Sequence, residues 1–274
     1  MATLAGKLAG QQPRDDALSG TPRAHAVDRW IFVFMAAWFI VIVLAGFIPD
    51  SIMKVGMVRA GARPPFPLVL HLHAVLMGSF LLLLLSQTLL MATGHKTRHM
   101  QIGILGMGLA ALLVVVGFIL APTMYHQTWT GLQTAPQAVQ ASLRDLLSFQ
   151  ENILLLQARI GILFPLFLGI GLRARGSDAG MHKRMMFLAT VMALPAGIDR
   201  ISWLPTTMPA SPLTVDLYTL LAVSPMLVWD VFRNHRVHAA YWIWAAIVLP
   251  TSVFLNAVWD TAWWHATAKH IMGV

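Results

Sequence analysis

Six charged side chains fall within or at the edge of long apolar stretches, where a charge needs a partner or a role. They are Glu151, Arg159, Asp199, Arg200, Asp216 and Asp260. A charge at the centre of a bilayer costs about 2.5–3.5 kcal/mol on insertion scales, so such residues normally face the interior of a helix bundle. The set therefore predicts a polar cavity. The carboxyl groups of Glu151, Asp199, Asp216 and Asp260 are candidate catalytic acids or bases.

The two arginines of this set allow two interpretations. In the first, they form structural ion pairs, Arg159 with Asp199 and Arg200 with Asp216. In the second, Arg159 and Arg200 bind a cofactor, because guanidinium groups pair well with the carboxylates of haem propionates. Counting residues along continuous helices, at about 1.5 Å per residue, places Arg159, Asp199 and Arg200 at one depth. Asp216 and His73 lie slightly further toward the outer face.

Eleven histidines are a high number for a chain of this kind, and imidazole is a common ligand of haem and of metal ions. We predict that His71, His73 and His126 bind a metal, and that His73 and His265 bind a cofactor. Residues two apart on a helix point in nearly opposite directions, so only one of His71 and His73 faces the bundle, and the apolar stripe favours His73. The alternative is that both only form hydrogen bonds at the interface.

Other histidines open three basic turns along the chain, and we assign them to the opposite side. His99, His182 and His238 stand beside lysines and arginines, where contacts with lipid phosphates would account for them. Their similar depth also permits a second haem on that side of the membrane. A ligand role and a lipid-contact role therefore both stay open for these three residues.

The composition decides the class of protein. Of 274 residues, 57% are hydrophobic and 11% are charged, and there is no cysteine. A soluble domain has about 25% charged residues, so this composition argues against a soluble enzyme and against a nucleic-acid-binding module. The net charge of +8 does not indicate a nucleic-acid partner here, because basic loops at one face of a membrane account for it. The absence of cysteine excludes disulfides and thiolate sites.

The apolar residues predict an all-α, polytopic membrane helical bundle, because a spanning helix needs about 20 mostly apolar residues. Seven segments qualify: Trp30–Ile48, Leu68–Ala92, Gln101–Ala121, Phe149–Leu172, Met185–Leu204, Leu213–Phe232 and Ala239–His265. Residues 1–29 then form a disordered cytoplasmic tail, 30–265 the transmembrane domain and 266–274 a short outer tail. Between the third and fourth segments, the cap-like Thr134–Pro136 predicts a short amphipathic helix on the outer surface.

The basic residues orient this bundle in a plasma (bacterial inner) membrane. With seven spans, 12 lysines and arginines fall on the side of the N-terminus, 5 fall on the other side, and Arg159 and Arg200 make up the total of 19. Cytoplasmic loops carry the excess of positive charge, so we predict a cytoplasmic N-terminus and an outer C-terminus.

Four stretches carry a resemblance. The sequences "HLHAVLMGSFLLLLLSQTLL", "HKTRHMQIGILG", "HKRMMFLAT" and "LVWDVFRNHRVHAAYWIW" resemble a group of poorly characterised bacterial multi-pass membrane proteins, over roughly residues 70–270. That resemblance implies no particular activity. The chain is more faintly similar to four-helix transmembrane cytochromes b, which implies His73, His99, His182 and His238 as the corresponding residues. However, His73 lies at the opposite membrane face from the other three.

Three functions follow from these features. The first is binding of haem b or a metal ion with a redox role, with a quinone or another lipophilic molecule as partner. The second is acid–base chemistry on a lipophilic substrate by an isomerase, hydrolase or cyclase. In that case Asn256, Trp259, Asp260 and Trp263 share one face of the last helix, and the tryptophan rings favour a cationic intermediate. The third is a transporter or an assembly subunit.

Overall fold

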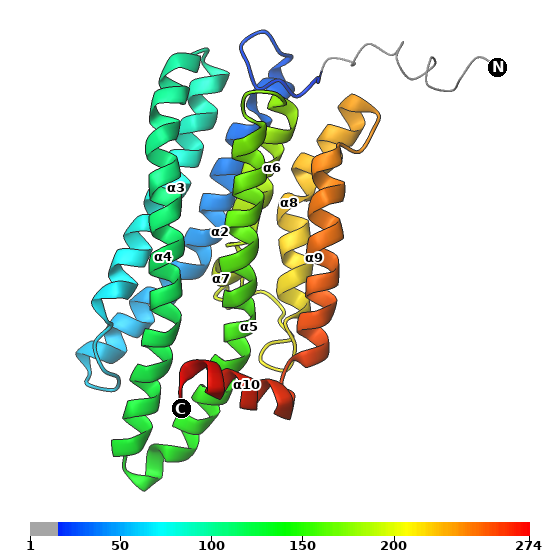
Figure 1. Ribbon diagram of the computed structural model, residues 1–274. Coiled ribbons are helices and arrows are strands. Elements are labelled where there is room, and N and C mark those ends of the chain that lie inside the picture. Colours follow the sequence, from blue (N-terminus) through cyan, green and yellow to red (C-terminus); the bar gives the residue numbers. More distant parts are fainter. Residues whose placement is uncertain (1–15) are drawn as a thin grey trace, which may run out of the picture.

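The computed structural model describes residues 16–274, and the regular structure in that part is helical (Figure 1). Within it, six helices are long and apolar enough to cross a membrane. They are α2 (Ala26–Arg59), α3 (Leu68–Ala92), α4 (Lys96–Thr134), α5 (Gln137–Ala174), α8 (Leu213–Asn234) and α9 (Ala239–Val258). The predicted all-α membrane bundle is confirmed. Of the predicted tail, residues 1–15 lie outside the described residues, and 26–29 belong to α2.

The chain reverses direction at two ends of the bundle. The turns that follow α3, α5 and α8 lie at the end where the described chain begins, and we call this the basic end (Figure 1). It contains the turns at 92–96 and 234–239, which hold His95, His235 and His238, and the turn at 174–179, which is followed by His182 in the first turn of α6. The turns that follow α2 and α4 lie at the other end, which we call the C-terminal end because the chain finishes there.

The fifth predicted span is not one helix. It consists of α6 (Ala179–Val191), the short α7 (Pro195–Ile198) and a loop up to α8. The prediction of a continuous helix over Met185–Leu204 is therefore wrong. Residues 192–194 form a turn after α6, and Pro195 begins α7, where its missing N–H costs no helical hydrogen bond. Non-helical backbone at membrane depth is tolerated where protein surrounds it, and this segment packs against α2, α5, α8 and α9.

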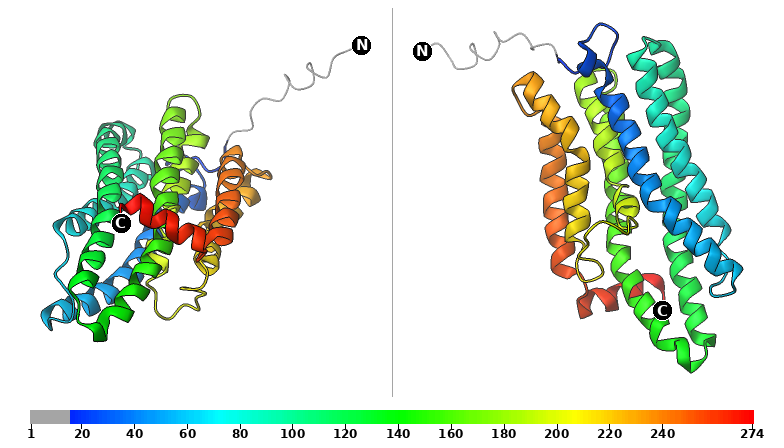
Figure 2. Two further views of the ribbon diagram at one scale, coloured as in Figure 1. Left: turned by 60° about the horizontal axis from the view of Figure 1, so that its bottom comes forward. Right: turned by 180° about the vertical axis from the view of Figure 1, so that it is seen from behind.

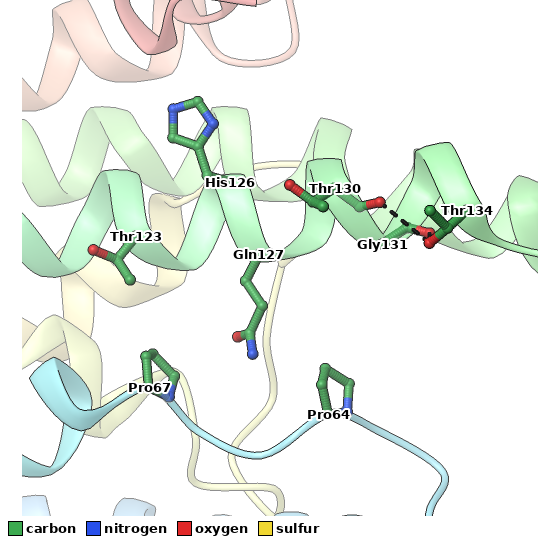
Figure 3. A pocket seen from close by; sticks show the side chains of 8 residues that line it. All are labelled: Pro64, Pro67, Thr123, His126, Gln127, Thr130, Gly131 and Thr134. Carbon is green, nitrogen blue, oxygen red and sulfur yellow. Dashed lines mark hydrogen bonds between the residues drawn. The ribbon is translucent and has the colours of Figure 1, made fainter.

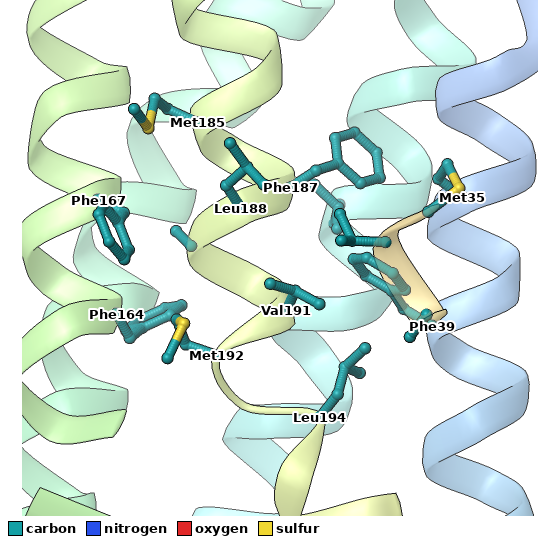
Figure 4. Close-up of a cluster of buried hydrophobic side chains, with 14 of the residues drawn as sticks. Met35, Phe39, Phe164, Phe167, Met185, Phe187, Leu188, Val191, Met192 and Leu194 are labelled. Carbon is teal, nitrogen blue, oxygen red and sulfur yellow. The ribbon is translucent and has the colours of Figure 1, made fainter. Parts of the chain in front are cut away.

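The core forms where α6 and its break meet α2 and α5 (Figure 4). Phe187 on α6 has its ring centre 5.5 Å from that of Phe32 and 5.8 Å from that of Phe39, both on α2. On the other side of α6, Met185 and Leu188 are fully buried. Burial of this broken segment thus depends on large side chains of both neighbouring helices.

Helix α2 approaches α7 through two glycines. A Cβ atom added to Gly46 would lie 2.0 Å from the carbonyl oxygen of Gly197, so only glycine permits this approach. We expect Gly46→Ala to lower the free energy of unfolding by about 1–3 kcal/mol, the usual cost of overpacking. Gly56→Ala on the same helix is the matched control, because nothing lies within 4 Å of its Cβ position. Unfolding in detergent measures both, and equal stabilities would contradict this account.

The two longest helices pass beyond the bundle at the C-terminal end. Helix α4 has 39 residues, or about 58 Å at 1.5 Å per residue, which exceeds the roughly 30 Å apolar layer of a bilayer. Pro136 is the N-cap of α5, which runs on without a break to Ala174. The separate surface helix predicted after Thr134 is therefore wrong, since those residues form the first turns of α5.

The last predicted helix, Ala239–His265, is also wrong in its second half. Helix α9 ends at Val258, and Asp260 adopts a positive φ of 59°. A new helix, α10 (Ala262–Met272), begins after Thr261, whose side chain accepts a hydrogen bond from the Trp264 N–H. The predicted shared face around Asp260 does not form, because this turn redirects the chain. Helix α10 lies across the C-terminal end against α5 and α4 (Figure 2).

Candidate functional site

Two histidine rings lie close together, edge-on, near the basic end. His99 lies in the first turn of α4 and His182 in the first turn of α6. Their ring centres are 6.4 Å apart, and the ring planes are nearly perpendicular at 81°. Both side chains are half-buried. The sequence alone left a ligand role for this pair open, and the packing of α6 against the α4–α5 side brings the two rings together.

The hydrogen bonds of His182 fix its tautomer. Its Nδ1 atom lies 2.8 Å from the carbonyl oxygen of Gly171 on α5. A carbonyl only accepts, so Nδ1 carries the proton and the lone pair of Nε2 remains available for a metal. Histidines that bind metals usually donate their other N–H in this way.

His99 contacts Gln87 of α3 from two directions. Its Nδ1 atom lies 3.4 Å from the Gln87 backbone carbonyl oxygen. The Gln87 side-chain amide, in the orientation that satisfies its other contacts, lies 2.5 Å from the same Nδ1 atom. If the proton is on Nδ1, this N–H donates to the Gln87 carbonyl oxygen and Nε2 is free to bind a metal. If the proton is on Nε2, Nδ1 accepts a hydrogen bond from the Gln87 amide. His99 can act as a ligand only in the first of these tautomers, and that tautomer requires the Gln87 amide to turn so that its oxygen, not its nitrogen, lies beside Nδ1.

A buried ion-pair network holds α6 in place beside this histidine pair. The side chain of Arg184 is fully buried and donates to Asp230 of α8 and to Asp16. Tyr241 of α9 donates to the same Asp230 at 2.8 Å. Burial alone would raise the pKa of Asp16, but its hydrogen bond from Arg184 and the nearby charge of Lys183 outweigh burial and hold that pKa well below its usual range. The network joins three helices to the start of the described chain.

A second cluster lies under α10 at the C-terminal end, and it contains three predicted site residues. Glu151 is 2% exposed and accepts from Tyr125 at 3.0 Å. His265 on α10 contacts Glu151 through Nδ1 at 2.6 Å and Asp260 through Nε2 at 3.0 Å. Both contacts are hydrogen bonds only if the imidazole carries two protons or one carboxyl is protonated. Asn152 of α5 donates to Asp260 at 3.0 Å, so the cluster fastens α10 to α5.

This fastening should weaken in acid. Hydrogen bonds from Asn152 and then His265 lower the pKa of Asp260 from its ordinary value of 3.8. A lowered pKa in the docked state means that Asp260 supports docking above pH 3.8, and that this support is lost as the pH falls through the lowered value. We expect spin labels at Lys269→Cys on α10 and Ser142→Cys on α5 to show one narrow distance distribution at pH 7 that broadens in acid.

The control for this experiment is Asp260→Asn, which cannot titrate. The chain has no native cysteine, so only the two introduced positions carry labels. The acid-induced broadening should be smaller in the Asp260→Asn variant. Equal broadening with and without Asp260 would contradict the assigned role of this carboxylate.

Arg159 and Arg200 have other partners than those predicted. Arg159 donates to Asp216 at 2.5 Å and to Ser252 at 2.8 Å. Arg200 lies 3.4 Å from Asp50 of α2, with its guanidinium 4.8 Å from the ring centre of Phe47. The pairs Arg159–Asp199 and Arg200–Asp216 are therefore wrong. The break in the fifth span rotates Arg200 toward α2 and invalidates depths counted along a continuous helix.

The predicted metal ligands are not brought together. His71 is exposed and stacks edge-on against Phe66, with ring centres 6.2 Å apart. His73 is half-buried and lies against α4 near Gly117, as its predicted inward orientation requires. His126 lines an open cavity of about 490 Å³ beside Gln127, and its ring points away from the two prolines opposite (Figure 3). In the part of the chain that the structure describes, no group of three or more His, Cys, Asp or Glu residues could hold a metal ion.

Comparison with known proteins adds no relative. No family model, curated protein or solved structure matches this chain. The resemblances drawn from sequence patterns therefore stay predictions, and the geometry of the side chains carries the functional argument.

Sequence reasoning missed the network around Arg184 altogether. Asp230 lies one turn from the end of α8 and is 1% exposed, and Asp28 of α2 is equally buried. Arg233 and the Trp229 indole N–H both donate to Asp28. The sequence signal was Asp230, which lies in the apolar run before Arg233. This signal is weak, because a charged residue near the end of a predicted span can equally belong to the loop that follows.

Proposed function

We propose that this integral multi-pass membrane protein binds a b-type haem near its basic end, where His99 and His182 would hold its iron. The observation that supports the proposal is the close pair of rings, 6.4 Å apart between centres, with nearly perpendicular planes. Metal–nitrogen bonds to imidazole are about 2 Å long, so two imidazoles on opposite sides of one iron have ring centres about 6 Å apart. When bound, a haem with two imidazole ligands supplies one-electron transfer.

The surroundings of the pair suit such a cofactor. His182 already donates its Nδ1 proton to a carbonyl, which sets the ring orientation. Arg175 at the end of α5 lies against Met107 of α4, two helical turns from His99. A guanidinium at this position is available to a propionate. The sequence predicted other cofactor-binding residues, and these do not lie at the histidine pair: His73, His265, Arg159 and Arg200. Of these, His265 already contacts two carboxylates.

The direct test is an optical spectrum of the purified protein. We expect a Soret band, a sharpened α band after reduction, about one haem per chain and a low-spin ferric electron paramagnetic resonance signal. The protein must be produced with haem precursor in excess, so that the supply of cofactor is not limiting. A protein without a Soret band under these conditions would refute the proposal.

Acid–base chemistry and transport stay predictions, and we do not favour them. The carboxylates that His265 joins already hold structural hydrogen bonds between α5 and α10. Those contacts account for Glu151 and Asp260 without a substrate.

We also infer that the basic end faces the cytoplasm. The excess of lysine and arginine that supports a cytoplasmic N-terminus gathers in turns at this end, and such an excess marks cytoplasmic loops. Alkaline phosphatase fused after Val274 should then be active and a fluorescent protein fused there should be dark. The opposite pattern would invert the orientation.

A further inference from the structure

A cavity opens between α8 and α9 at about the middle of α5. Its volume is about 410 Å³, within the range of about 300–1,000 Å³ of small-molecule sites. Most of its wall is apolar, and its polar and charged lining residues are Arg159, Asp216, Thr219, Ser252 and Asn256. The cavity is therefore complementary to an amphiphile, because it has a small polar end and a long apolar wall.

The polar end has hydrogen-bond donors to spare. The Arg159 side chain is 3% exposed, and its Nε atom has no hydrogen-bond partner among the described residues. Ser252 accepts from Arg159, which leaves its hydroxyl proton free to donate. Asn256 donates one amide proton to the Ser252 carbonyl and accepts from Ser211, so one of its two amide N–H donors is also left over. A buried donor without a partner is unfavourable, so an acceptor oxygen is the complementary group.

The charge of the site favours a neutral ligand. Asp216 contacts Arg159 at 2.5 Å and compensates its positive charge. An anion entering the cavity would lose its hydration and face the Asp216 carboxylate as well as the arginine. A carbonyl oxygen, in contrast, accepts from the free donors and brings no charge.

The opening of the cavity faces the lipid side of the bundle. Among its lining residues, Leu217 is 49% exposed, Leu249 is 50% exposed and Val253 is 70% exposed. All three lie on helices that are candidate membrane spans. A ligand therefore reaches the site by lateral entry from the bilayer.

We propose that this cavity binds a neutral, lipid-soluble molecule whose head carries a carbonyl oxygen, with Arg159 and Ser252 donating to that oxygen. Membrane quinones and the esters of glycerolipids both have this chemistry. The proposal does not rest on the haem, because the cavity is formed by other residues than the histidine pair.

The test uses the full chain in nanodiscs of a diether phosphatidylcholine, which has no ester carbonyl. Decyl-ubiquinone is the first probe and dioleoylglycerol the second, and retained probe is extracted and quantified. We expect saturable binding of about one molecule per chain. If the quinone binds saturably, the ligand class is the quinones. If only dioleoylglycerol binds saturably, the ligand class is the glycerolipid esters.

Three variants test the location and the chemistry. Leu249→Trp fills the opening and should weaken binding at least tenfold, whereas Phe254→Trp is the control because Phe254 is equally exposed on α9 and does not line the cavity. Ser252→Ala removes one donor and keeps the Arg159–Asp216 pair, so it should weaken binding about fivefold, as loss of a hydrogen bond worth about 1 kcal/mol does. The proposal is overturned if neither probe saturates, or if Leu249→Trp or Ser252→Ala binds like the unchanged chain.

Discussion

Replacement of His182 by alanine is expected to lower the haem content per chain at least tenfold and to remove the low-spin signal. The same loss is expected for His99→Ala, because the two rings lie 6.4 Å apart and each would supply one axial ligand. The measurement is haem per protein after purification, with far-UV circular dichroism to verify that each variant folds.

His95→Ala is the matched control for this experiment. His95 lies four residues before His99, is exposed, and contacts only the Thr93 hydroxyl through its ring. It should retain full haem content. A further variant, His182→Met, should keep a six-coordinate haem with a raised reduction potential, since methionine–histidine ligation has that effect. If His99→Ala and His182→Ala both keep the unchanged spectrum, the haem is bound elsewhere.

The second large effect concerns the stability of the basic end. Arg184→Met should lower the free energy of unfolding by about 3–5 kcal/mol, because removing one partner of a buried ion pair leaves an uncompensated charge. The charge left behind is that of Asp230, which is 1% exposed and keeps only the neutral donors of Tyr241 and Asn234. Reversible unfolding in detergent measures the change.

Two further variants make this prediction specific. Arg236→Met removes an arginine from an exposed turn at the same end, and it should change stability by less than about 0.5 kcal/mol. The double variant Arg184→Met, Asp230→Leu should recover part of the loss, since replacing a buried pair by apolar residues is often tolerated. An Arg184→Met variant as stable as Arg236→Met would show that the network contributes little.

The spans were predictable because apolar length alone decides them. Leu68–Ala92 was predicted to the residue, polar ends lengthen α2, α4, α5 and α8 beyond their predicted spans, and α9 ends earlier than predicted. The fifth span failed because hydropathy does not register a break, and Pro195 was no clear signal, since α2, α4, α5, α8 and α9 each continue through a proline. The break explains why Arg200 lies beside Asp50 and not Asp216, because a depth counted along a continuous helix does not apply beyond it.

Side-chain partners were harder to predict than spans. Depth and sequence order do not fix the rotation of a helix about its axis, so Arg159 could have faced Asp199 or Asp216 equally well. The pair of His99 and His182 needed the actual contact between α4 and α6, which are not neighbours in the chain. Only His73 could be oriented from the sequence, because one apolar stripe on its own helix sufficed.

The broken fifth span, which consists of α6, α7 and the loop to α8, has a consequence for insertion into the membrane. Helix α6 has 13 residues, fewer than the roughly 20 needed to cross a bilayer by itself, and the loop after α7 would leave backbone groups unpaired in lipid. This stretch therefore cannot settle in the membrane as an independent unit. It must enter together with α5 or wait for α8 and α9, so we expect the insertion of residues 179–212 to depend on the helices that surround them.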